Sequence, residues 1–177
     1  MKSIMISIQP QWVSKILNKE KLVEIRKTKP KCELPCKVYI YCTKGKKLYK
    51  CVSNFDEDLL NGKVVAEFTL NKVGILERDL NDWLPKNRYD VSNELLKNIN
   101  LNQNELWNYG QGKTLYAWNI DNLKIYDKPK LLQVFFKPCG DCDKKDTDRC
   151  IYEDSYCRAK VIRPPQSYCY VEELENE

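Results

Sequence analysis

Short apolar or alternating segments recur along the chain and predict β-strands. They are rich in β-branched and aromatic residues, which favour the pleated, half-buried surface of a sheet. A turn signal, Asn61-Gly62, precedes one of them. The expected strands, in chain order, are Ile4–Ile8, Glu20–Lys27, Cys36–Thr43, Lys63–Leu70, Leu115–Ile120, Leu131–Phe136 and Ser167–Glu172.

A short helix is predicted directly after the first strand. Pro10 suits a first helical turn, where its missing N–H is not needed. The apolar residues Val13, Ile16 and Leu17 follow at helical spacing. We therefore expect this helix to pack on the core.

Residues 75–112 differ in character from the strands and predict a helical insertion. Ser92 is a suitable N-cap for a helix over Asn93–Ile99. Asn104 is expected to cap a second helix over Glu105–Tyr109, which the following glycine would end.

Residues 138–163 are polar and rich in cysteine, and they predict a loop or a small knuckle. The chain contains no internal repeat and no recognisable linker. We therefore expect one α+β domain over residues 1–177, built as a small β-barrel with short flanking helices, the helical insertion and the Cys-rich loop.

The second predicted strand, with the sequence EKLVEIRK, interleaves charged and apolar residues. In a strand, Val23 and Ile25 would face one side while Glu24 and Arg26 face the other. Such a charged face either lines a pocket or lies in solvent. In solvent the ion pair would contribute under about 1 kcal/mol to stability and would have no function. Lys21 would point away from Glu24 in a regular strand, so the strand must begin after Lys21 or contain a bulge.

The composition is that of an ordinary globular protein, with 42% hydrophobic and 31% charged residues among 177. No apolar run approaches the roughly 20 residues that cross a bilayer, and the N-terminus lacks the apolar core of a signal peptide. We expect a reducing, cytoplasmic location without a membrane partner, so the nine cysteines are not expected to form a disulfide framework. Histidine is absent, which excludes His-based catalysis and metal ligation.

Positive charge is concentrated in the N-terminal part of the chain. Residues 1–50 contain 13 lysines and arginines against three acidic residues, whereas the remainder contains 17 against 22. A basic segment of this kind suits contact with phosphates. Lysines that only interact with solvent would give the same composition, so charge leaves both interpretations open.

Several segments together resemble the ASCH domain family of the PUA-like superfamily. The opening stretch SIQPQWVSKILNKEKLVEIRK resembles the strand, proline-led helix and Lys-x-x-Glu-x-Arg motif of that family, whose positions here are Lys21, Glu24 and Arg26. The resemblance continues in YCT, GKVVAEFTL, KTLYAWNI and RPPQSYCYVEEL, and residues 75–112 and 138–163 look like additions to it.

The resemblance implies that the protein binds RNA or a modified nucleoside or nucleotide, as PUA-like folds commonly do. Lys21, Glu24, Arg26 and Glu67 are then expected to line a cavity of nucleotide size, because a nucleobase edge needs a mixed row of donors and acceptors. The further wall residues that we expect, with burial in the core as the alternative for each aromatic, are Tyr41, Thr43, Tyr116, Trp118, Ser167 and Tyr168.

A second function is implied by bacterial relatives that hydrolyse N4-acetylcytidine with a lysine, a threonine and a glutamate. By motif position, Lys21 and Glu67 are the catalytic candidates if the chain is an enzyme, and a desolvated lysine beside Arg26 could act as base or nucleophile. Glu24 stands where the threonine would be, which removes the hydroxyl nucleophile and argues against this reaction. A protein-binding adaptor that uses the barrel as a scaffold is the third alternative.

Four cysteines within residues 139–157 predict a metal site. Their spacing is Cys-x2-Cys-x7-Cys-x6-Cys, and a glycine inside the first pair permits a tight turn. Four thiolates suit tetrahedral structural zinc; an iron–sulfur cluster is the less favoured metal alternative. Two disulfides or four unconnected thiols would need no metal. The expected ligands are Cys139, Cys142, Cys150 and Cys157.

Overall fold

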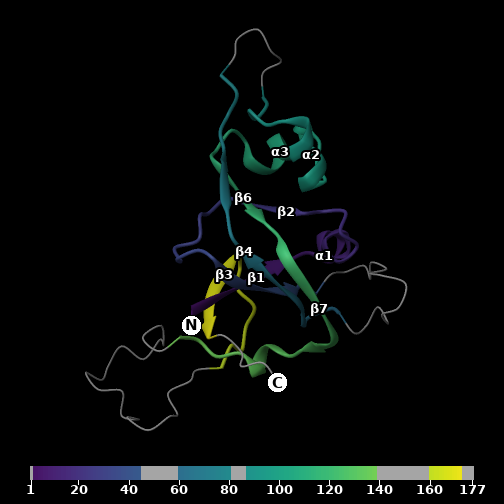
Figure 1. The fold of residues 1–177 in the computed structure, drawn as a ribbon, viewed down its shortest axis with the longest axis vertical. Helices are drawn as coiled ribbons and strands as arrows, with labels where there is room; N and C mark the ends of the chain where they lie inside the picture. The colour runs from purple at the N-terminus through teal and green to yellow at the C-terminus, as the bar shows by residue number, and fades with distance from the viewer. Residues whose placement is uncertain (1, 45–59, 81–86, 139–159, 173–177) are drawn as a thin grey trace, which may run out of the picture.

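A computed structural model describes residues 2–44, 60–80, 87–138 and 160–172. Within these ranges, eight strands form two sheets, and one end of the molecule carries a pair of short helices (Figure 1). The α+β class predicted from the sequence is confirmed. Among the described helices, none is both long enough and apolar enough to cross a membrane.

The larger sheet has five strands in the order β7-β4-β3-β1-β8. β1 and β3 are parallel, and the other neighbouring pairs are antiparallel. Its strands are β1 (Lys2–Ile8), β3 (Cys36–Cys42), β4 (Val64–Leu70), β7 (Asp121–Lys130) and β8 (Tyr168–Glu172).

The smaller sheet is antiparallel, in the order β2-β6-β5, with β2 (Val23–Arg26), β5 (Val73–Leu76) and β6 (Leu115–Asn119). Two segments pass from one sheet to the other: β4 leads into β5, and β6 leads into β7. Neither sheet closes on itself within the described ranges, so the expected closed barrel is wrong. The physical reason is that each sheet, within these ranges, keeps two edge strands that do not pair with each other, β7 and β8 in the larger sheet and β2 and β5 in the smaller.

The helices are α1 (Pro10–Leu17), α2 (Asn93–Ile99) and α3 (Gln103–Gly110). The predicted cap of α2 is confirmed, since the Ser92 hydroxyl accepts a hydrogen bond from the Leu95 N–H. The predicted cap of α3 is wrong: Asn102, not Asn104, caps this helix. The Asn102 side chain accepts a hydrogen bond from the Glu105 N–H, and the Glu105 carboxylate accepts one from the Asn102 N–H. This reciprocal pair places the start of the helix two residues earlier.

Three further differences from the sequence prediction concern strands. The segment predicted as a strand at Leu131–Phe136 instead contains a short 3-10 helix, η2 (Leu132–Val134). β5 and β7 were not predicted. β5 has only four residues and includes a glycine, and β7 is an edge strand whose alternating exposed positions carry Asn and Lys side chains, so neither has a continuous apolar run.

The core has three buried clusters that alternate across the strands. Ile4, Ile6 and Ile8 of β1 pack with α1 in one cluster, while Met5 packs on the other face of the five-stranded sheet. A third cluster lies between the small sheet and the helices α2 and α3. Figure 1 shows these two helices together above β2 and β6. This third cluster fixes the orientation of β2, from which the site is built.

Candidate functional site

The two faces of β2 have different surroundings. Val23 and Ile25 belong to the cluster beneath α2 and α3. Glu24 and Arg26 therefore face the other way, and they are only 8% and 9% exposed. Lys21 precedes the strand, which begins at Val23. The alternation read from the sequence is thus present, and its charged face is buried, not exposed to solvent.

A cleft of about 610 Å³ opens over this charged face. Its volume lies in the range of small-molecule sites. Its lining comes from the end of β1, α1, β2, the residue after β3, α3 and the segment before β8. The lining residues are Ser7, Ile8, Gln9, Trp12, Lys21, Glu24, Ile25, Arg26, Thr43, Leu101, Glu105, Asn108, Tyr109 and Gln166.

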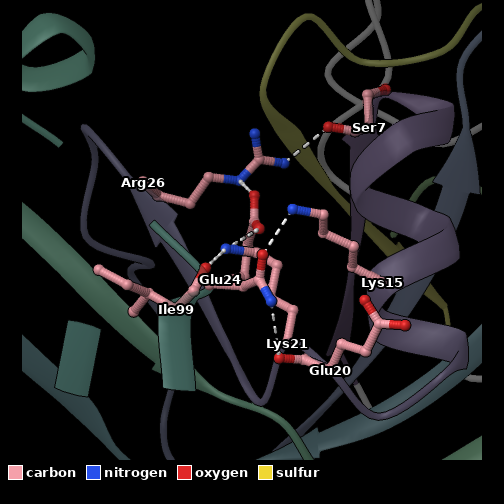
Figure 2. Close-up of polar contacts among 8 residues, drawn as sticks. Ser7, Lys15, Glu20, Lys21, Glu24, Arg26 and Ile99 are labelled. Carbon is pink, nitrogen blue, oxygen red and sulfur yellow. Dashed lines mark hydrogen bonds and ion pairs between the residues drawn. The ribbon is translucent and has the colours of Figure 1, made fainter. Parts of the chain in front are cut away.

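Three charged side chains form a row on the floor of this cleft (Figure 2). One carboxylate oxygen of Glu24 lies 3.5 Å from Nε of Arg26, and the other lies 3.7 Å from Nζ of Lys21. Glu24 therefore sits between two cations. We call Lys21, Glu24 and Arg26 the ionic row.

Arg26 is anchored to two distant parts of the chain. Its Nη2 donates to the carbonyl of Ser7, at 2.9 Å, and to the carbonyl of Ser167, at 3.1 Å. One side chain thus links β2 to the end of β1 and to the segment before β8. The guanidinium is held in one orientation by these two carbonyls and by Glu24.

Lys21 is anchored from the opposite end of the row. Its Nζ donates a 2.7 Å hydrogen bond to the carbonyl of Ile99 and lies 5.3 Å from the centre of the Trp12 ring. Lys21 is only 3% exposed. Burial lowers the pKa of Lys21 below its ordinary value, and Glu24 opposes that shift by stabilising the ammonium.

Two aromatic residues from different helices line the cleft, Trp12 of α1 and Tyr109 of α3. Burial raises the pKa of the Tyr109 hydroxyl, while Arg26 lowers it and Glu24 raises it. Tyr109 lines the same cleft as the three residues of the ionic row. Lys27 lies over the Tyr109 ring, with its Nζ 4.9 Å from the ring centre.

The structure brings together some of the predicted site residues. Thr43 lines the cleft with the ionic row, and Ser167 contributes its backbone carbonyl to Arg26. Trp118 is fully buried in the core, with the Tyr168 ring 5.8 Å away, centre to centre. Tyr116 packs against the same core cluster from a partly buried position.

Glu67 and Tyr41 lie elsewhere. Tyr41 belongs to the cluster on the far face of the five-stranded sheet. Glu67 accepts a hydrogen bond from the Tyr126 hydroxyl, and Tyr126 belongs to that same cluster. The predicted catalytic pair of Lys21 and Glu67 is therefore not assembled, because successive residues of β4 face opposite sides of the sheet and Glu67 is on the side without the cleft.

The helix α3 also supplies residues to the cleft, Glu105, Asn108 and Tyr109, which were not predicted as site residues from the sequence. Asn108 and Tyr109 are neighbours, and Glu105 lies one helical turn before them, so a single face of α3 carries all three. This polar and aromatic face was a signal in the sequence. Nothing in the sequence pattern indicated that it would lie across from β2.

The predicted metal ligands Cys139, Cys142, Cys150 and Cys157 lie outside the described residues, and zinc stays a prediction. In the ranges that the structure does describe, no group of three or more cysteines, aspartates or glutamates is arranged to hold a metal ion. Cys32 and Cys36 are a pair of free thiols whose sulfurs lie 3.1 Å apart.

No family model matches the chain, and no curated protein matches it by sequence. Solved structures from Zymomonas mobilis match its fold. A tyrosine-to-phenylalanine mutant of ZmASCH has a TM-score of 0.53 and 16% identity, covering 98% of this chain and 92% of its own. A structure of ASCH from the same organism has a TM-score of 0.50 and 14% identity, covering 97% and 88%. The chain therefore has an ASCH-like fold, as the sequence motifs predicted.

Proposed function

We propose that this ASCH-like protein binds a nucleobase in the cleft, presented either by a free nucleoside or by single-stranded RNA. The observation that carries the proposal is the buried ionic row, which places donors and an acceptor side by side on the floor of a cleft of about 610 Å³. Base edges are recognised by such mixed rows, and bases stack on aromatic rings such as Trp12 and Tyr109.

The charge balance of the cleft favours a base over a phosphate as the group that reaches the floor. The lining contains two cations, Lys21 and Arg26, and two carboxylates, Glu24 and Glu105. Glu24 lies directly between the cations, so a phosphate would meet a carboxylate at the centre of the row. A neutral planar ligand avoids this repulsion.

Phosphate contacts, if the ligand is RNA, would come from lysines around the cleft. Lys27 follows β2 directly and lies over the ring of Tyr109. Its ammonium is therefore close to a cleft wall while it remains exposed. A strand whose base enters the cleft could place a neighbouring phosphate near this residue.

Calorimetric titration with nucleosides and short RNAs tests the proposal. The variants Arg26→Ala and Glu24→Ala should each weaken binding at least about tenfold, because each removes part of the edge recognition. Arg88→Ala is the matched control, since Arg88 pairs with Asp79 outside the cleft. Unchanged affinity in both cleft variants, with their fold intact, would show that the ligand binds elsewhere.

Salt dependence distinguishes the two sources of the base. RNA binding should weaken steeply between about 50 and about 500 mM salt, because counterions are released from phosphates. Binding of a neutral nucleoside should change little over the same range. A complete lack of response to nucleosides and RNA would favour the adaptor alternative.

A second candidate, hydrolysis of an N4-acylated cytidine, is favoured by one observation. Lys21 is a buried lysine with a lowered pKa at the floor of the cleft. Since Glu67 is remote, Glu24 is the carboxylate that could assist Lys21. Turnover detected by mass spectrometry and abolished by Lys21→Ala would support this reaction.

A further inference from the structure

We infer that the ionic row selects a uracil-type base through its imide edge, the run of O4, N3–H and O2. The inference rests on the proposed function and specifies its ligand. It starts from the order of the three groups along the floor of the cleft, in which the carboxylate of Glu24 lies between Arg26 and Lys21.

The row presents a donor, an acceptor and a donor to the cleft. Nη2 of Arg26 donates to the two carbonyls, and Nε faces Glu24 in an ion pair at 3.5 Å without a hydrogen bond. Its Nη1 points away from the other drawn groups in Figure 2. A carboxylate can accept about four hydrogen bonds, so Glu24 keeps acceptor sites between its two cations. An ammonium has three donors, and Lys21 uses one for Ile99 and one toward Glu24.

The complement of this row is an acceptor, a donor and an acceptor. Among the standard bases, uracil and its 5-methyl form, thymine, have that order on the pairing edge, and uracil is the one found in RNA. Cytosine would turn the lone pair of N3 toward Glu24, as would adenine with its N1. Guanine has two adjacent donors, so its amino group would face Lys21, donor against donor.

The row is held in place before any ligand arrives. Arg26 is fixed by carbonyls from two chain segments, and Lys21 is fixed by the end of α2. A ligand with the wrong order of donors and acceptors therefore cannot be accommodated by a simple rotation of either cation. Pre-organised, buried polar groups discriminate strongly because a mismatched partner leaves them unpaired.

Nucleoside titrations of the unmodified protein test the inference. Uridine should bind at least about tenfold more tightly than cytidine, guanosine or 3-methyluridine, in which a methyl group replaces the N3 hydrogen. Cytidine or guanosine binding as tightly as uridine would overturn the uracil assignment and leave the proposed function intact. Binding of none of the four nucleosides and of no RNA would overturn both.

The variant Glu24→Gln supplies a second test. A glutamine can turn its amide N–H toward N3 of cytosine, so the ratio of uridine to cytidine affinity should fall at least about tenfold. Glu67→Gln is the matched control, since Glu67 lies on the far side of the larger sheet, and it should leave the ratio unchanged. An unchanged ratio in folded Glu24→Gln protein would overturn the inference. If that variant does not fold, the 3-methyluridine comparison decides.

Discussion

The ammonium of Lys21 donates a 2.7 Å hydrogen bond to the carbonyl of Ile99, the last residue of α2. The same segment makes a backbone contact, since the Leu22 N–H donates to the carbonyl of Asn98. The helical segment is thus tied to the residues that open β2. The geometry of the cleft floor consequently depends on helices that the sequence resemblance treats as an addition.

Replacing Lys21 with methionine should destabilise the fold by about 3 kcal/mol, because Glu24 loses one of its two cations and the Ile99 carbonyl loses its donor. Urea denaturation measures the loss. The exposed Lys128→Met is the control and should change stability by less than about 0.5 kcal/mol. Equal effects of the two substitutions would mean that the buried ammonium contributes nothing to the fold.

A methyl group at residue 110 should destabilise the helical end of the molecule. The Cβ of an alanine there would collide with the Tyr89 hydroxyl and lie 2.7 Å from a methyl carbon of Leu115. We expect Gly110→Ala to lower the free energy of unfolding by about 2–3 kcal/mol, as measured by denaturant titration.

Two comparisons check this interpretation of Gly110. Gly74→Ala is the control, since its Cβ would meet Ala117 at 3.5 Å, an ordinary contact, and stability should change little. The double variant with Gly110→Ala and Tyr89→Phe should lose less stability than the two single variants lose together, because the second substitution removes the colliding hydroxyl. Strict additivity would contradict the proposed collision.

Removal of the Tyr109 ring should weaken nucleoside binding without unfolding the protein. Tyr109 lines the cleft and is partly exposed, so Tyr109→Ala should lower affinity by about 1–3 kcal/mol through lost stacking. Trp107→Leu, on the same helix but in contact with Tyr89, is the control and should keep the affinity. Titration calorimetry of both variants shows whether Tyr109 contacts the ligand. Equal losses of affinity in the two variants would mean that Tyr109 acts only through the structure of the helix.

Alkaline pH should destabilise the fold through Cys36. Burial, with a smaller contribution from Cys32, raises the pKa of the Cys36 thiol to about 12. Below about pH 9 the thiol is protonated in both states and its contribution to stability is complete. Between about pH 9 and about pH 12 the unfolded chain loses this proton first, so stability falls as pH rises.

The comparison of wild type with Cys36→Ala isolates this effect. Wild type should lose up to about 2 kcal/mol more than the variant between pH 8 and about pH 11. The other titrating groups, including Cys169, are present in both proteins and largely cancel. A stability difference that stays constant with pH would contradict the raised pKa of Cys36 in the folded state.

Metal analysis of the reduced protein tests the cysteine motif. We expect about one zinc ion per chain, bound through the four thiolates predicted from the spacing. Cys142→Ser should lower the zinc content, whereas Cys169→Ser, in β8, should not. Substoichiometric zinc together with substoichiometric iron would contradict a metal site.

Glu24 and Arg26 could be placed from the sequence because the signal for them is local. Alternation within β2 puts these two side chains on one face and Val23 and Ile25 on the other, and a strand of four residues allows few other arrangements of its side chains. Glu67 was misplaced because its position depends on tertiary structure. Alternation in β4 shows that Glu67 points away from the apolar side chains of Ala66 and Phe68, but it does not show which face of the sheet carries the cleft.

The contribution of α3 could not be predicted for a related reason. Its polar and aromatic face is local, but its position over β2 depends on packing among Ile25, Ile99 and Leu106, which come from three different elements. Such tertiary contacts have no signature in a single sequence. The barrel was expected from the series of short strands and from the resemblance, and the passage of β4 into β5 and of β6 into β7 was not visible in the apolar pattern.

Arg26 donates its second backbone hydrogen bond to the carbonyl of Ser167, which lies 141 residues later in the chain. A ribosome therefore releases β2 long before the partner that orients its guanidinium has been made. A nascent chain that has passed β6 can pair its small sheet but still lacks this anchor. Recognition of the ligand should then be acquired only after the segment around Ser167 has been made, so that bound ligand reports a chain whose two sheets are linked through Arg26.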